Sequence, residues 1–299
     1  MKPWPVLLFI VTGFSLLLGA EPDLEKEVAN CVERIKTISG VSEEVMWSLP
    51  GRDEPPISDL EGYGMAAIPL LAPYLSDTTP TKAARLHGSR RTRTATVNEY
   101  IGYVINRIAD HYFYLPKDHD SVDILGDEPL VDARKIKAFQ VQIHDWYKRN
   151  KDKSLAERKL DDLNDAFHYN RFASYKWLKE SKLKEGRSPL EHQIETLLKN
   201  EGRSLAQSEM VACAEALAAI GDVRSTDVVR KVCDHLSLTG YSTIPNLFGA
   251  HRSLAALGQK QEALTRLNEL KQKHLKEMEV RDPGTQKEFL QRLDGAEKW

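Results

Sequence analysis

The stretch ACAEALAAIGDVRSTDVVRKVCDHL, residues 212–236, decides the fold of this chain. Its apolar residues return every three or four positions on both sides of Gly221-Asp222, which predicts two short amphipathic helices joined by a tight turn. The pentapeptide LAAIG at 217–221 recurs as LAALG at 254–258, which is 37 positions later. A recurrence of about 20–50 residues that is built on helix pairs is typical of a helical solenoid.

Helical patterns continue on both sides of this stretch. Before it, from Leu155 onward, we expect helices over 155–163 and 170–182 and one between Ser188-Pro189 and Asn200-Glu201-Gly202. After it, we expect helices over 244–257, 261–276 and 285–293. Ser154 and Glu157 predict a capping box in front of the helix at 155–163. The N-terminal half is less regular, with helices expected over 24–38, 94–112 and 132–149 and loops at 48–56 and 116–130. Because we find no run of alternating apolar and polar residues that is flanked by turn residues, we expect no strand and an all-α fold.

Two segments carry a family resemblance. Residues 62–77, GYGMAAIPLLAPYLSD, and the turn GDVR at 221–224 resemble the HEAT-repeat family, with the best coverage over 205–275 and a looser one over 155–200. Armadillo and tetratricopeptide arrays are the near alternatives. The resemblance implies a right-handed α-solenoid of stacked antiparallel helix pairs whose concave face binds a partner, and it implies no shared catalytic residues. It predicts an irregular N-terminal helical region at 21–154, with a HEAT-like helix at 62–77, and HEAT-like helical repeats at 155–299.

The first 20 residues have the order of a secretory signal peptide. Lys2 precedes an almost wholly apolar run from Val6 to Leu18, and the small residues Gly19-Ala20 come before a polar segment. The run is 13 residues long, which is short of the ~20 residues that a spanning helix needs. We therefore expect a cleaved signal peptide at 1–20 and an exported protein, periplasmic or secreted. Leu18 stands where a small residue is usual, so an uncleaved membrane anchor is the alternative.

Composition and motifs favour a binding protein over an enzyme. The chain has 299 residues, a net charge of −2 and a pI of about 6.5, a balance that does not favour nucleic acid as a partner. We find no zinc-protease, nucleophile-elbow, Walker or paired-cysteine motif, so we predict no catalytic residues and no cofactor. The expected function is a scaffold that binds a protein partner, with membrane contact only if residues 1–20 are retained. The alternative is a small-ligand-binding protein or enzyme with a site near 85–128.

Three groups of residues in that segment are candidates for binding. Basic side chains interspersed with Ser and Thr suit phosphate or carboxylate ligands, against the simpler interpretation of a charged approach to the next helix: Arg85, Arg90, Arg91 and Arg93. An acidic loop offers oxygen ligands for calcium, against the simpler interpretation of a solvated surface loop: Asp118, Asp120 and Asp123. The aromatic run at 111–114 suits a ligand groove at a helix end, or packing between helices.

Three cysteines occur in the chain, Cys31, Cys213 and Cys233. The last two lie ten residues either side of Val223, at the expected helix turn, so a disulfide between them is one interpretation. The other, which we favour, is that both are small buried apolar residues. An odd count leaves at least one thiol unpaired or intermolecular in an exported chain.

Overall fold

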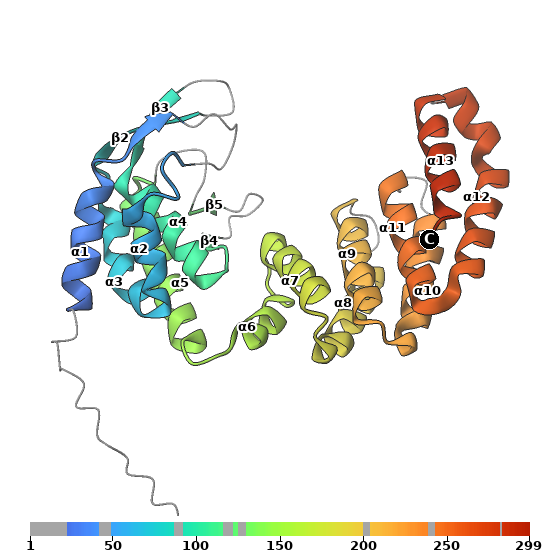
Figure 1. Cartoon of the computed structure of the whole chain (residues 1–299), viewed down its shortest axis with the longest axis horizontal. Coiled ribbons are helices and arrows are strands. Elements are labelled where there is room, and N and C mark those ends of the chain that lie inside the picture. The colour runs from blue at the N-terminus through green and yellow to red at the C-terminus, as the bar shows by residue number, and fades with distance from the viewer. Residues whose placement is uncertain are drawn as a thin grey trace, which may run out of the picture. The chain divides into compact units, whose positions relative to one another are not determined.

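The computed structural model describes residues 23–41, 49–86, 92–115, 122–124, 130–199, 204–238, 243–281 and 283–299. The chain divides into two compact units, residues 1–148 (unit 1) and 149–299 (unit 2). Both units are mostly helical, so the predicted helical class is confirmed (Figure 1). Across the described ranges, no helix combines the length and the apolar character that crossing a membrane requires. The segment expected to be a signal peptide, 1–20, lies outside the described residues.

Unit 1 is built around one buried helix. Its helices are α1 (Leu24–Ile35), α2 (Pro55–Gly62), α3 (Ile68–Leu71), α4 (Val97–Ala109) and α5 (Ala133–Asn150), the last of which continues into unit 2. Helix α4 contacts α1, α2 and α3, and its side chains Tyr100, Ile101, Val104 and Ile105 are fully buried. The expected helices at 24–38, 94–112 and 132–149 are therefore confirmed, with ends a few residues shorter or longer.

A small sheet lies beside these helices, and the expectation that strands are absent is wrong. Three strands are hydrogen-bonded in the order β1 (Ser39–Val41), β2 (Pro80–Leu86), β3 (Thr92–Thr96). Strand β1 is parallel to β2, and β2 is antiparallel to β3. A second pair joins β4 (Tyr114–Leu115) and β5 (Val122–Asp123). The buried positions of β2 and β3 include Ala83 and Ala95, so the strands lack the bulky alternating apolar residues that mark a strand in sequence.

The segment 62–77 is helical but does not form the single HEAT-like helix expected. Helix α2 ends at Gly62, and the chain then forms a 3-10 turn at Gly64–Ala67, the four-residue α3, and a second 3-10 turn at Ala72–Ser76. Gly64 has a φ of +60°, which interrupts the helix before it reaches Ile68. Pro73 has no backbone N–H to continue the α-helical hydrogen bonds, so α3 ends at Leu71.

Unit 2 consists of helices, and those that follow α6 fall into two sets that alternate along the chain. The helices are α6 (Leu155–Asp162), α7 (His168–Ser181), α8 (Arg187–Lys199), α9 (Ser204–Ile220), α10 (Thr226–Leu238), α11 (Ile244–Leu254), α12 (Lys260–Arg281) and α13 (Pro283–Ala296). Helix α9 lies between α7 and α11, and α13 contacts α11, so these four form one layer, the odd-helix layer (Figure 1). Helices α8 and α10 contact each other, and we call α8, α10 and α12 the even-helix layer. Each expected helix from 155 to 293 is confirmed.

The turns between the layers repeat as the sequence predicts. Gly221 and Gly258 both have positive φ, of 75° and 90°, and end helices of the odd layer. Lys182, at the end of α7, has the same left-handed conformation with a φ of 54°. In chain order, Lys182, Gly221 and Gly258 lie 39 and 37 residues apart. A 3-10 turn follows Lys182 at Lys184–Gly186, and another follows Gly221 at Val223–Ser225. The capping box at Ser154 and Glu157 is also present.

Candidate functional site

Of the four predicted anion-binding arginines, Arg93 is the one whose side chain the structure describes. Its Nη1 and Nη2 donate to the two carboxylate oxygens of Glu99 at 2.7 and 2.6 Å. Glu99 is buried in the first turn of α4 and also accepts from the backbone N–H of Thr96 at 2.9 Å. This fork-shaped ion pair ties β3 to α4, so the described contacts of Arg93 are structural. Arg85 belongs to β2, but its side chain, like Arg90 and Arg91, lies outside what the structure describes.

The predicted calcium loop falls almost wholly outside the described residues. Asp118 and Asp120 are not described, and Asp123 is known only as a backbone position in β5, paired with Tyr114. The calcium hypothesis stays a prediction.

The two cysteines of unit 2 are buried thiols outside any disulfide. Cys213 and Cys233 are both fully shielded from solvent, and neither forms a disulfide. Burial raises the pKa of the Cys233 thiol to about 12 and raises that of Cys213 as well, so both stay protonated near neutral pH. They occupy the positions of small apolar residues in the core, in keeping with the favoured interpretation.

Polar contacts across the odd-helix layer join positions about one recurrence apart. Glu215 on α9 binds Lys179 on α7 at 2.6 Å and Arg252 on α11 at 3.1 Å. The three residues are 36 and 37 positions apart, which matches the spacing of LAAIG and LAALG. They form a charged row across α7, α9 and α11, in which one carboxylate is shared by two cations.

A second ion pair between α7 and α9 has a buried carboxylate. Arg171 on α7 donates to both carboxylate oxygens of Glu209 on α9, at 2.9 and 2.6 Å, and also to the carbonyl oxygens of Asp165 and Ala166. Glu209 is buried, and Tyr175 donates to it at 3.4 Å. Because every contact joins elements of the same unit, we assign Arg171 and Glu209 to the fold.

Exposed apolar residues mark the N-terminal ends of the same helices. Tyr169, Leu205 and Pro245 are each the second residue of α7, α9 and α11, and all three are exposed, Tyr169 by 50% and Leu205 by 41%. Contacts between these helices join positions in the same order along each helix, so the three residues lie at the same end of the odd-helix layer, and we call them the apolar edge. Sequence reasoning did not single them out, although Tyr169 and Leu205 lie 36 positions apart.

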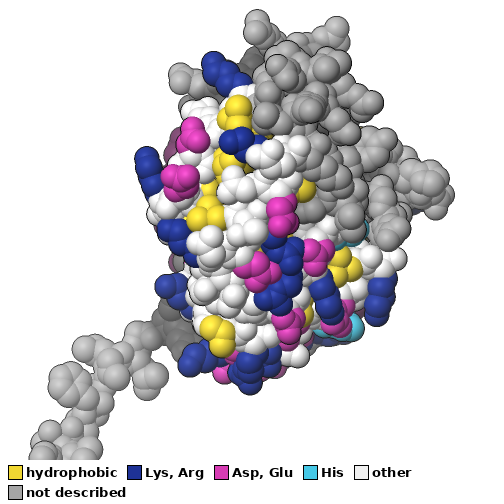
Figure 2. Space-filling view, turned by 90° about the vertical axis from the view of Figure 1, so that its right-hand side faces the viewer, with side chains coloured by type: hydrophobic (Ala, Val, Ile, Leu, Met, Phe, Trp, Pro, Cys, Tyr) yellow, Lys and Arg dark blue, Asp and Glu magenta, His cyan; other side chains and the backbone are white. Residues whose placement is uncertain are grey.

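The even-helix layer carries charges of both signs. Arg230 on α10 binds Glu262 on α12 at 2.7 Å, Arg266 on α12 binds Asp234, and Lys231 lies 3.7 Å from Glu195 on α8. Figure 2 views the molecule from the side at the right of Figure 1, where acidic and basic side chains are interspersed rather than separated by sign. Such mutual neutralisation does not favour a strongly charged partner on this side.

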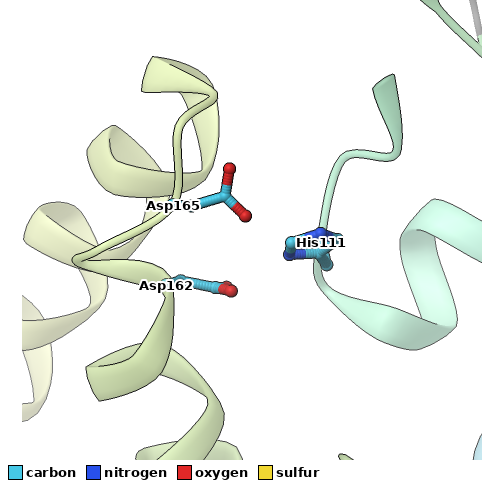
Figure 3. Close-up of side chains that lie close together, drawn as sticks. All are labelled: His111, Asp162 and Asp165. Carbon is cyan, nitrogen blue, oxygen red and sulfur yellow. The ribbon is translucent and has the colours of Figure 1, made fainter. Parts of the chain in front are cut away.

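Three further ionisable residues, labelled in Figure 3, hold local structure within their own units. In unit 1, His111 follows α4 and lies with its ring 5.0 Å from that of Phe113 and 5.4 Å from that of Trp146. In unit 2, Asp165 accepts from the backbone N–H of Phe167 at 2.7 Å, just before α7 begins, and Asp162 lies 3.8 Å from Lys159.

Comparison with known proteins adds no relative to this description. No protein-family model, no curated protein and no solved structure matches the chain.

Proposed function

We propose that unit 2 is a HEAT-like α-solenoid and that it acts as a scaffold, binding a protein partner across its odd-helix layer. The observation that carries the proposal is the row Lys179–Glu215–Arg252, in which successive helices meet through positions 36 and 37 residues apart. The left-handed helix ends at Lys182, Gly221 and Gly258 recur with nearly the same spacing. Contacts between neighbouring repeats at a constant sequence separation are what a solenoid requires.

The dimensions of the odd-helix surface favour a protein over a small molecule. Packed helices have axes about 8–10 Å apart, so α7, α9 and α11 together span roughly 20 Å between the outer axes. The apolar edge at Tyr169 and the charged row at Lys179 are ten residues apart on α7, or about 15 Å at ~1.5 Å per residue. A ligand that contacts both features therefore has the extent of a peptide segment or a folded surface.

The chemistry of this surface also fits a protein partner. Protein interfaces combine apolar anchors with a polar rim. Tyr169 and Leu205 provide apolar side chains that are already exposed, and Glu215 with its two cations provides the polar part. The partner would itself be an exported protein, since the apolar run at 6–18 favours export of this chain.

A matched pair of variants tests the proposal. The double variant Tyr169→Asp/Leu205→Asp places two negative charges on the apolar edge, and Val223→Asp places one negative charge on a turn residue that is 67% exposed. Immobilised wild-type chain and both variants are exposed to the exported proteins of the source cells. Any protein retained by the wild type is then purified and titrated against all three by calorimetry.

We expect a saturable partner that binds the wild type and the Val223→Asp variant equally and the double variant at least tenfold more weakly. Equal binding to all three, or retention that does not saturate, contradicts the proposed surface. Circular dichroism spectra that coincide for the three proteins establish that the double variant is folded.

A further inference from the structure

Unit 1 contains a pocket lined partly by residues 103–112, within the segment 85–128 that the alternative function designates, and partly by Glu61 and Gly64. Its volume is about 570 Å³, which lies within the range of about 300–1,000 Å³ usual for small-molecule sites. Helix α4 supplies one wall, the end of α2 and Gly64 a second, and the segment after α4 a third. The side chains used below are those of Glu61, Tyr103, Asn106, Arg107 and Tyr112.

Two charged groups of the wall, Arg107 and Glu61, compensate each other, and Asp110, the residue after α4, also lines the pocket. Arg107 donates from Nε to Glu61 Oε1 at 3.1 Å and from Nη2 to Oε2 at 3.3 Å. Its guanidinium carbon also lies 5.9 Å from the centre of the Tyr103 ring. The pair therefore presents hydrogen-bond donors and acceptors side by side, without an excess of either charge.

Asn106 adds a donor that the protein leaves unused. Its side chain is 6% exposed, and its Oδ1 accepts from the backbone N–H of Phe113 at 3.3 Å. Its Nδ2 has no hydrogen-bond partner among the residues that the structure describes. Buried polar groups are almost always satisfied, so an unused donor at the wall of a pocket points to a ligand or a water that accepts from it.

The wall at Gly64 leaves open space for a ligand. Gly64 has a φ of +60°, and a Cβ atom built at that position would meet no heavy atom within 4 Å. Tyr112, which is 42% exposed, lies at the rim and offers an aromatic face together with a phenolic hydroxyl.

We propose that this pocket binds a neutral polyhydroxylated ring, that is, a sugar. A hydroxyl group both donates and accepts, so adjacent hydroxyls match the alternating donors and acceptors of Arg107 and Glu61 and accept from Asn106. The C–H face of a sugar ring packs against Tyr103 and Tyr112. An organic cation must displace Arg107 from the Glu61 carboxylate, and an anion is repelled by that same carboxylate. Both are therefore disfavoured relative to a neutral ligand. This proposal is independent of the scaffold function of unit 2.

Ligand-observed saturation-transfer NMR on the full chain tests the assignment. The probes are D-glucose, D-galactose and N-acetyl-D-glucosamine, with choline and benzoate as charged probes of similar size. A ligand of about 12 heavy atoms at ordinary efficiency gives a Kd on the order of 1–10 mM, so titration extends to several times that range.

Two variants alter the pocket and one serves as control. Asn106→Asp keeps the oxygen that accepts from Phe113 and removes the Nδ2 donor. Tyr112→Ala removes a rim side chain that is 42% exposed. Tyr169→Ala makes the same substitution at a tyrosine of unit 2 that is 50% exposed.

We expect at least one sugar to bind saturably to the wild type and to the Tyr169→Ala variant, and at least tenfold more weakly to both pocket variants. Saturable binding of choline or benzoate in preference to every sugar overturns the ligand class. Absence of binding by all probes, or sugar binding that survives both pocket substitutions, overturns the site.

Discussion

Replacing Lys182 by glycine is expected to stabilise unit 2, although the side chain being removed is a lysine at the end of a helix. Lys182 adopts φ 54° and ψ 33°, and its N–H bonds to the carbonyl oxygen of Leu178 at 2.9 Å. A non-glycine residue in this conformation costs roughly 1–2 kcal/mol, because its Cβ crowds the following carbonyl oxygen. Glycine removes that cost but loses about 0.5–1 kcal/mol of additional backbone entropy on folding. The free energy of unfolding should therefore rise by about 0.5–1 kcal/mol.

The reverse substitution at an equivalent position checks the same reasoning. Gly221 has a φ of 75°, and a Cβ there would meet no heavy atom within 4 Å. Gly221→Ala should therefore lower the free energy of unfolding by about 1 kcal/mol through backbone strain alone. Lys176→Gly is the control, since Lys176 is exposed within α7 and glycine in a helix interior costs about 1 kcal/mol.

Urea unfolding of the full chain measures the three changes in the free energy of unfolding. The loss of helix is followed by circular dichroism at about 222 nm. For a unit of this size, 1 kcal/mol corresponds to a Tm shift of roughly 2–4 °C. If Lys182→Gly destabilises the protein as much as Lys176→Gly does, the left-handed helix end at 182 is refuted. The structural equivalence of Lys182 with Gly221 and Gly258 then fails with it.

Three further predictions follow from buried groups of unit 2. Glu209→Gln leaves the partly buried Arg171 without its counter-charge and should cost about 3 kcal/mol in urea unfolding, whereas Glu195→Gln at an exposed ion pair should cost less than about 1 kcal/mol. His251 is fully buried, and burial lowers its pKa, so below about pH 6.5 the unfolded chain takes up a proton that the folded chain does not. Stability should fall as pH drops from 7.5 to 5.0, by at most about 2 kcal/mol from this group, and His251→Leu should flatten the dependence measured by unfolding at each pH. A Cβ at Gly249 would lie 2.8 Å from Cγ1 of Val211, so Gly249→Ala should cost about 1–3 kcal/mol, and adding Val211→Ala should recover part of that loss in thermal unfolding.

The recurring left-handed helix ends of unit 2 were predictable from the sequence only where glycine occupies them. LAAIG and LAALG located the helix ends at Gly221 and Gly258, because glycine is the residue that adopts positive φ without strain. The third such end was missed because a lysine occupies position 182, and no property of lysine indicates that conformation. The apolar edge was missed for a related reason, since Tyr169 and Leu205 match in exposure and position but not in residue type.

In unit 1 the sheet was not predictable from apolar alternation. Strands β2 and β3 bury Ala83 and Ala95 where a detectable strand would bury valine or isoleucine. The break within 62–77 was visible in Gly64 and Pro73, but the resemblance to a HEAT helix outweighed those two residues.

Neighbouring residues decide which candidate side chains remain available for a ligand. Arg93 stood in a basic run that suggested anion binding, yet Glu99, six residues later in the first turn of α4, binds it from both carboxylate oxygens. The aromatic run after α4 divides differently. His111 and Phe113 are buried, whereas Tyr112 between them is 42% exposed and lines the pocket together with His111. An ionisable or aromatic run therefore indicates a binding site only after the partners of each member within the fold are known. Here Arg93 has such a partner in Glu99, whereas Arg85, Arg90 and Arg91 stay predictions, and the described residues at the end of α4 line a pocket.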